Sequence, residues 1–164
     1  MNKIIVIGCP GSGKSYFSKK LKDILDMPIY HLDLIWNKPD KTTISREEFD
    51  KILNGIFKEE KWIMDGNYQR TLEMRIKACD TIILLDFDLE VSLDGATSRV
   101  GKDRDDMPWQ EDSLNEEFKN KILDFRNDKL PEIYRLLDEY KDEKGIIIFK
   151  NRDEANKYLE SLVK

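Results

Sequence analysis

The strongest constraint on this chain is a glycine-rich segment near its start. Residues 8–15 read Gly-Cys-Pro-Gly-Ser-Gly-Lys-Ser and match the pattern G-x-x-x-x-G-K-[ST] in full. The segment follows an apolar run, Lys3–Ile7, and precedes an amphipathic stretch, Lys14–Leu25, so it joins a predicted strand to a predicted helix. Glycines let backbone N–H groups converge on phosphate oxygens, and the helix N-terminus adds its dipole. The segment therefore predicts a phosphate-binding loop, and the alternative is a glycine turn that binds no ligand.

The residue types in this loop indicate how a nucleotide and its metal ion would be held. We expect the ammonium of Lys14 to reach the β- and γ-phosphates of ATP, and the hydroxyl of Ser15 to ligate Mg²⁺. An adenine is expected to stack in the region Lys150–Arg152, behind the last predicted strand. The predicted nucleotide contacts are Gly8, Pro10, Gly11, Ser12, Gly13, Lys14, Ser15, Tyr16 and Arg152. No base-reading residue chooses between ATP and GTP.

Short apolar runs alternate with longer amphipathic stretches along the chain. The apolar runs predict strands at Lys3–Ile7, Pro28–Leu32, Trp62–Met64, Thr81–Leu85 and Ile146–Phe149. The amphipathic stretches predict helices at Lys14–Leu25, Ser45–Lys58, Thr71–Lys77, Leu89–Arg99, Ser113–Tyr140 and Asp153–Val163. Because continuous apolar strands are typical of sheets covered on both faces, this alternation predicts a three-layer α/β domain with a parallel sheet.

Three local signals refine this prediction. Residues Ser45–Glu48 form a capping box, which predicts a helix start at this point. Pro131 is expected to break or kink the long helical stretch after Leu130. The charged segment Gly101–Trp109 has no periodicity, so it is either a solvated loop or a lid that closes over a substrate.

Length and composition narrow the class of protein. The chain has 164 residues and 40% hydrophobic residues, which predicts one folded domain over residues 1–164. Its net charge of −5 argues against direct nucleic-acid binding, which needs a basic surface. No apolar run approaches the roughly 18 residues of a membrane span, and the first apolar run is too short for a signal peptide. Cys9 and Cys79 suggest reduced thiols in a cytoplasmic protein.

Acidic residues follow three of the predicted strands. Asp33, Asp65 and Asp86 each stand where a strand ends, and ligands of open parallel sheets bind outside the carboxyl ends of the strands. Asp33 and Asp65 are expected to share the tasks of holding Mg²⁺ and orienting an acceptor, whereas Asp86 is better explained as a turn or helix-cap residue. His31 is expected on the same strand face as Asp33, either in the core or toward the site.

A switch GTPase would carry a base-reading N-K-x-D motif. Residues Asn37–Asp40 match that motif formally, but they follow the second predicted strand, which is too early to read a base. A large ATPase would need a longer chain for its oligomerisation or motor elements. The length therefore favours a small-molecule kinase.

Four motifs in order, Gly8–Ser15, His31–Trp36, Trp62–Tyr68 and Thr81–Asp86, together resemble the bacterial topology-modulation protein (FlaR-related) family. That family belongs to the P-loop kinases that are similar to adenylate kinase. The similarity runs over nearly the whole chain and includes residues 101–107, which look like the G-K-x-R-x-D-M lid segment of the family.

The resemblance implies a nucleotide-binding kinase fold with sheet order 2-3-1-4-5 and a short, metal-free lid over residues 99–112. Asp65-Gly66 looks like the Asp-Gly of adenylate kinases, in which the Asp helps to hold Mg²⁺. Those enzymes continue with Phe-Pro-Arg, whereas this chain has Asn67–Arg70, which argues against a nucleoside monophosphate acceptor. Arg126 and Arg135 lie where such kinases carry further phosphate-binding arginines.

These observations lead to two hypotheses. The first is an ATP-dependent kinase that phosphorylates a nucleotide or another small molecule, with Mg²⁺ held by Ser15 and Asp65. Its predicted catalytic residues are Lys14, Asp33, Asp65, Arg99 and Arg104. Its predicted acceptor residues are Asp33, Trp36, Asn67, Tyr68, Arg70 and Arg126. The second hypothesis is a regulatory nucleotide-binding protein of the topology-modulation type with little catalysis, which leaves the acids and lid arginines without a use.

Overall fold

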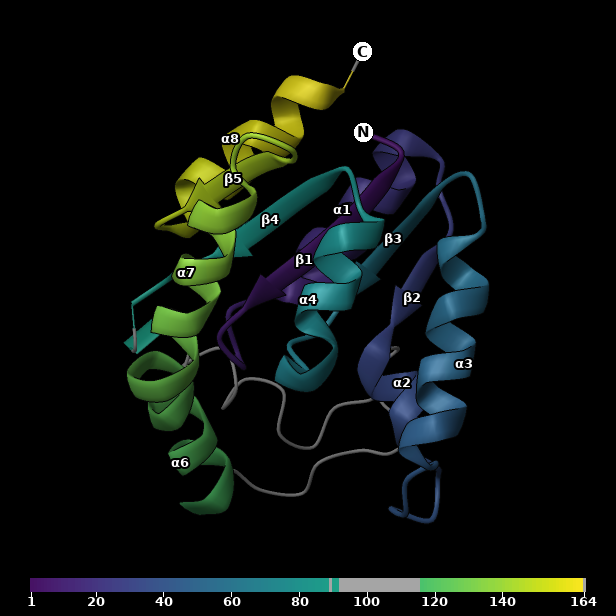
Figure 1. Cartoon of the computed structure of the whole chain (residues 1–164). Helices are drawn as coiled ribbons and strands as arrows, with labels where there is room; N and C mark the ends of the chain where they lie inside the picture. The colour runs from purple at the N-terminus through teal and green to yellow at the C-terminus, as the bar shows by residue number, and fades with distance from the viewer. Residues whose placement is uncertain (89, 92–115, 164) are drawn as a thin grey trace.

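The computed structural model describes residues 1–88, 90, 91 and 116–163. Within them, five parallel strands form one sheet in the order β2-β3-β1-β4-β5. The strands are β1 (Lys3–Gly8), β2 (Ile29–His31), β3 (Trp62–Asp65), β4 (Thr81–Leu85) and β5 (Gly145–Phe149). The predicted three-layer α/β class and the sheet order are both confirmed (Figure 1).

Helices cover both faces of the sheet (Figure 1). Their bounds are α1 (Lys14–Leu25), α2 (Leu32–Trp36), α3 (Arg46–Phe57), α4 (Gln69–Ala78), α6 (Glu116–Asp124), a π-helix η1 (Phe125–Lys129), α7 (Leu130–Tyr140) and α8 (Arg152–Leu162). The helices α3, α4 and α7 pack on one face of the sheet, in front in Figure 1, and α1 and α8 pack on the other.

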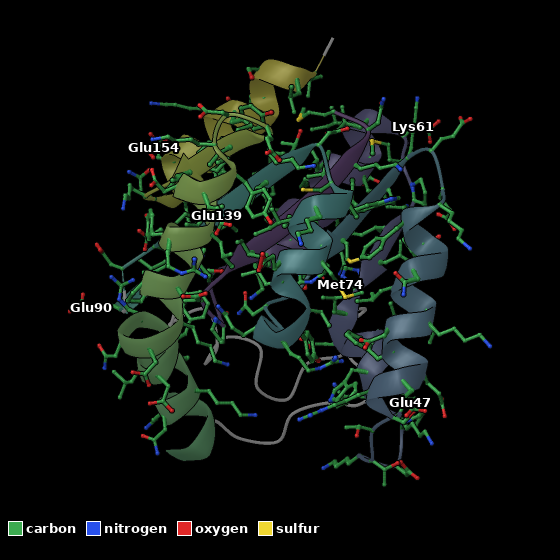
Figure 2. All side chains as sticks on the ribbon, viewed as in Figure 1. Glu47, Lys61, Met74, Glu90, Glu139 and Glu154 are labelled. Carbon is green, nitrogen blue, oxygen red and sulfur yellow. The ribbon has the colours of Figure 1, made fainter. Side chains whose placement is uncertain are left out.

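The central strand β1 shows why the sheet is buried on both sides. Ile5 and Ile7 point into the core under α3, α4 and α7, whereas Ile4 and Val6 point into the core under α1 and α8. Side chains alternate between the two faces of a strand, so a run of four apolar residues fills both cores. Charged side chains such as those of Glu47, Glu139 and Glu154 lie on the outside (Figure 2).

The predicted capping box is confirmed, because the hydroxyl of Ser45 accepts a hydrogen bond of 3.1 Å from the Glu48 amide at the start of α3. The predicted end of the second strand is wrong. The strand β2 stops at His31, and Leu32 begins the short helix α2, so Asp33 lies in a helical turn and does not share a strand face with His31.

Of the two effects predicted for Pro131, a break or a kink, the break does not occur, because the chain stays helical from α6 through η1 into α7. The π-helical turn at Phe125–Lys129 ends two residues before the proline, which stands in the first turn of α7. A proline has no N–H to donate and its ring crowds the preceding turn, and a local π-helix accommodates both effects without ending the helix.

The predicted helix at Leu89–Arg99 falls largely outside the described residues, and the predicted lid at 99–112, with Arg99 and Arg104, lies wholly outside them. Among the helices that the structure describes, none is long and apolar enough to cross a membrane.

Candidate active site

The predicted phosphate loop lies between the end of β1 and the start of α1. Gly11 and Gly13 have φ of 84° and 94°, a region that favours glycine, and a side chain at Gly13 would meet no atom within 4 Å. The ammonium of Lys14 donates to the Cys9 carbonyl at 3.3 Å, so it is held over the loop. The loop thus combines open space at Gly13 with an ammonium group at a helix N-terminus, which fits a phosphate group.

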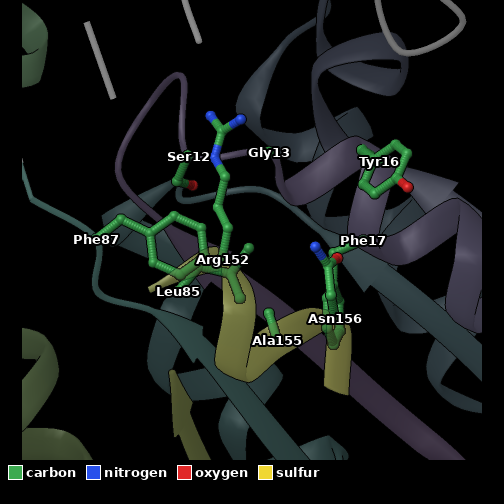
Figure 3. A pocket seen from close by; sticks show the side chains of 9 residues that line it. All are labelled: Ser12, Gly13, Tyr16, Phe17, Leu85, Phe87, Arg152, Ala155 and Asn156. Carbon is green, nitrogen blue, oxygen red and sulfur yellow. The ribbon is translucent and has the colours of Figure 1, made fainter. Parts of the chain in front are cut away.

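A pocket of about 300 Å³ adjoins the phosphate loop (Figure 3). It is lined by Ser12, Gly13, Tyr16, Phe17, Leu85, Phe87, Arg152, Ala155 and Asn156. Figure 3 shows Arg152 reaching from the start of α8 toward the loop that carries Ser12 and Gly13. The lining offers aromatic rings, the guanidinium of Arg152 and the amide of Asn156. These groups suit the nucleoside part of a nucleotide whose phosphates lie in the loop.

The oxygen donors predicted for Mg²⁺ come from helix α1, which follows β1, and from the end of the neighbouring strand β3. Ser15 is in the first turn of α1, and Asp65 ends β3, where it pairs in register with Val6 of β1. Among the described residues, no group of three or more His, Cys, Asp or Glu side chains could hold a metal ion alone. Ser15 and Asp65 would supply one hydroxyl and one carboxylate oxygen, and Mg²⁺ is commonly bound by one or two protein oxygens together with substrate phosphates and water.

The side chain of His31 contacts this predicted metal ligand. The Nδ1 atom of His31 lies 2.7 Å from Oδ2 of Asp65, and both side chains are less than a tenth exposed. Residues 31 and 65 are register partners on β2 and β3. The sequence left the place of His31 open, and the structure places it in the site's supporting contacts, where it fixes the orientation of the carboxylate.

The loop after β3 joins the two halves of the site. The Asn67 side-chain oxygen accepts a hydrogen bond of 3.1 Å from the Gly8 amide, at the start of the phosphate loop. Gly66 has φ of 136°, and a Cβ there would lie 2.8 Å from Leu32 Cβ. Glycine is thus required at this position by its backbone conformation and by the close approach of α2, rather than by space for a substrate.

Asp33 and Tyr68, both predicted to face an acceptor, contact each other. The Tyr68 hydroxyl donates to Oδ1 of Asp33 at 2.6 Å. Burial and the neighbouring Asp33 charge raise the pKa of Tyr68 well above its usual value, so its hydroxyl remains a donor. The ring centroid of Trp36 lies 6.1 Å from that of Tyr68 and 5.3 Å from that of Phe49, and both are edge-on contacts. The carboxylate of Asp33 thus lies beside a cluster of three aromatic side chains, Trp36, Phe49 and Tyr68, here called the aromatic wall.

Three arginines that the sequence singled out each contact a different part of the protein. Arg70 is exposed and forms a bidentate ion pair with Asp50 of α3, with distances of 2.8 and 3.0 Å. Arg135 is bound to Glu132 and Glu139 of its own helix. Arg126 donates a hydrogen bond of 2.7 Å to the backbone carbonyl of Phe87, one of the residues that line the pocket beside the phosphate loop.

Among the described residues, Asp86 lies at the centre of a polar cluster rather than in a turn or a helix cap. Its carboxylate accepts hydrogen bonds from Tyr134 at 2.5 Å and Lys150 at 2.6 Å, and Arg126 lies 3.6 Å away. Burial alone would raise the pKa of Asp86, but the bonds from Lys150 and Tyr134 and the Arg126 charge outweigh burial and lower it. The cluster ties the end of β4 to η1, α7 and the segment after β5.

Asp86→Asn is expected to lower the free energy of unfolding by about 1–2 kcal/mol at pH 7. The folded pKa is depressed, so the carboxylate stabilises the fold above its unfolded pKa of about 3.9, and this contribution is lost as the pH falls through the folded value. Urea unfolding at several pH values should give a constant difference from about pH 6 to 8 that narrows below about pH 4. Asp138→Asn, at an exposed site on α7, is the matched control. A difference undiminished below about pH 3 would contradict the assignment.

Some residues of the candidate site belong to no sequence motif, and the sequence did not predict them. Phe87 and Asn156 line the pocket only because β4 and α8 bring them beside α1. Arg75 is fully buried on the inner face of α4, together with Thr71, Leu72 and Ile76. Its place among the apolar positions of the helical pattern was the sequence signal that could have identified it as a buried charge.

No family model matches the chain, and no curated protein matches it, so these comparisons leave the resemblance to the topology-modulation family unconfirmed. The fold is similar to that of a gluconokinase from Sinorhizobium meliloti 1021, at a TM-score of 0.60 and 12% identity over 99% of this chain and 89% of the other. It is also similar to shikimate kinase from Acinetobacter baumannii, at a TM-score of 0.57 and 18% identity over 99% and 93% of the two chains. Shikimate kinase from Bacteroides thetaiotaomicron gives a TM-score of 0.55 and 15% identity over 97% and 94%. At these identities the likeness establishes architecture alone, and this chain therefore has the fold of the small-molecule P-loop kinases.

Proposed function

We propose that this protein is an ATP-dependent, Mg²⁺-requiring phosphotransferase that phosphorylates a small molecule bearing a hydroxyl or phosphate group. The observation that carries the proposal is the continuity of the phosphate loop with the pocket beside α8. One end offers Lys14 and open backbone at a helix N-terminus, and the other offers Arg152, Tyr16 and Asn156. This arrangement accommodates triphosphate and nucleoside in one extended site.

Within this proposal, bound ATP supplies the phosphoryl group, and Mg²⁺ held by Ser15 and Asp65 neutralises phosphate charge. The chain's own residues orient the partners: Lys14 holds the phosphates, and His31 holds Asp65 in place. Arg99 and Arg104 are proposed to add positive charge from the lid at 99–112, which would exclude water during transfer.

We propose that the acceptor binds beside Asp33, Trp36, Asn67 and Tyr68, at the carboxyl ends of β2 and β3. Asp33 would orient the acceptor hydroxyl, and the aromatic wall would pack against its carbon skeleton. Arg70 would have to leave Asp50 to bind an acceptor phosphate, which favours acceptors that present a hydroxyl over nucleoside monophosphates. Arg126, bound to the Phe87 carbonyl, would act on the nucleotide side.

The test is ADP release with ATP and Mg²⁺ against a panel of acceptors: nucleoside monophosphates, nucleosides, shikimate, gluconate and other hydroxylated metabolites. Acceptor-stimulated ADP release, absent without Mg²⁺ and lost in Lys14→Ala, would support the kinase and identify its acceptor class. Tight Mg·ATP binding with no stimulation by any acceptor would instead favour the regulatory nucleotide-binding protein. The net charge of −5 makes a protein partner the better target than DNA in that case.

A further inference from the structure

The structure contains a buried charged side chain for which the proposed reaction has no direct use. Arg75 lies on α4 and is fully buried. Its guanidinium donates hydrogen bonds to four acceptors: the Thr71 hydroxyl at 3.2 Å and the carbonyls of Gly66, Asn67 and Tyr68 at 3.0, 2.6 and 3.1 Å. All four acceptors are uncharged.

An arginine is a costly residue for this position if packing were its only task. Burial lowers the pKa of the guanidinium to about 10, so the group is still charged at neutral pH while it is removed from water. A leucine or methionine on the same helical face, like neighbouring Leu72, would pack without that penalty. The value of Arg75 must therefore lie in the groups that it binds.

Those groups are three consecutive carbonyls of a loop that has no regular hydrogen-bond ladder. Gly66 has a positive φ, and Tyr68, with φ of 18° and ψ of 77°, is the N-cap residue of α4, but its side chain makes no hydrogen bond to the helix end. A planar guanidinium has several donors in a fixed fork, which suits carbonyls that point to one spot. Arg75 therefore determines the path of the loop between β3 and α4.

The side chains of the same loop reach two different parts of the site. Asn67 binds the Gly8 amide at the start of the phosphate loop, and Tyr68 binds the carboxylate of Asp33 on α2. Shifting the loop would move both contacts together, because residues 67 and 68 are adjacent in the chain. Loop 66–68 therefore links the phosphate loop to the predicted acceptor side.

We propose that Arg75 is a positioning residue that fixes loop 66–68 and thereby sets the phosphate loop and Asp33 at a constant relative geometry. In so far as those two features bind nucleotide and acceptor, this inference rests on the proposed function. Arg75 touches neither substrate, and it acts through Asn67 and Tyr68.

Hydrogen exchange of single amides, followed by NMR, tests the structural part without any substrate. Arg75→Met is expected to speed exchange of the Gly8 amide by about tenfold or more and to leave β4 and β5 amides within about threefold. Lys77→Met, at an exposed site on the same helix, is the matched control and should change neither. Arg75→Lys keeps the charge but loses the fork, so it should fall between the wild type and Arg75→Met.

Two further variants separate the two contacts of the loop. Asn67→Ala should speed exchange at Gly8 alone, and Tyr68→Phe should leave Gly8 unchanged, whereas Arg75→Met affects the loop as a whole. Unchanged Gly8 exchange in Arg75→Met would overturn the proposal. Equal acceleration of β4 and β5 would overturn it as well, because it would show a role in packing only.

Kinetics then test the functional part. With an acceptor from the panel, Arg75→Met should reduce kcat/KM for the acceptor by about tenfold or more while the Kd of Mg·ADP changes less than about threefold. Equal loss of nucleotide affinity would overturn the link between the two sites. If the wild-type protein binds no Mg·ADP, the proposed function fails, and the exchange experiment still decides whether Arg75 positions the loop.

Discussion

Lys14→Ala is expected to reduce acceptor-stimulated ADP release by about 100- to 1,000-fold. The ammonium already lies over the phosphate loop, 3.3 Å from the Cys9 carbonyl, so it is placed to meet the charge that develops on the transferred phosphoryl group. A cation that acts mainly in the transition state affects kcat more than nucleotide binding. The measurement is steady-state ADP release, with calorimetric titration of Mg·ADP on the same samples.

The matched control is Lys22→Ala, because Lys22 lies on the same helix with an exposed side chain outside the pocket. Its ADP release should equal that of the wild type, and both variants should unfold at similar urea concentrations. Wild-type activity in Lys14→Ala would show that the phosphate loop is not where transfer takes place. A loss of thermal stability in Lys14→Ala alone would mean that the lost activity reflects unfolding.

Gly66→Ala is expected to lower the free energy of unfolding by about 3 kcal/mol. Two costs combine: a φ of 136° is strained for any residue with a side chain, and the new Cβ would lie 2.8 Å from Leu32 Cβ and 2.9 Å from Leu32 Cδ1. Neither α2 nor β3 can move away freely, because Leu32 is itself fully buried. Urea unfolding monitored by circular dichroism measures the change.

The chain provides a glycine with the opposite expectation. Gly55 lies exposed in α3, and a Cβ there would meet no atom within 4 Å. Gly55→Ala should therefore raise the free energy of unfolding by about 0.5–1 kcal/mol, because alanine favours the helix. A loss below about 1 kcal/mol in Gly66→Ala would show that the loop adjusts, contrary to the constant geometry proposed above.

The sequence predicted the parts of the fold that depend on local pattern. Strand β4 (Thr81–Leu85) and helix α1 (Lys14–Leu25) have the bounds expected from apolar runs and helical periodicity, and Ser45 caps α3 as its capping box requires. It could not predict α2, because residues 32–36 form a single short helix whose position depends on packing against Gly66. Nor could it predict the π-helical turn that lies before Pro131, through which the helix continues without a break.

The candidate site was predictable where it depends on one short motif, and not where it depends on tertiary contacts. Residues 8–15 join a strand to a helix and Asp65 ends a strand, as the sequence predicts, whereas their roles in binding stay predictions. The partners of those residues come from distant segments: His31 is 34 residues from Asp65, and Tyr134 is 48 residues from Asp86. Arg70 and Asp50 likewise meet only because α3 and α4 lie together on one face of the sheet.

The order of the strands also affects how the protein folds during its synthesis on the ribosome. Strand β1 is first in the chain yet lies in the middle of the sheet, and both of its neighbours, β3 and β4, come more than 50 residues later. At about 5–20 residues per second, translation leaves this apolar strand without its partners for several seconds. An unpaired Ile-Ile-Val-Ile edge is prone to aggregate, so the nascent chain should depend on chaperones until β3 emerges.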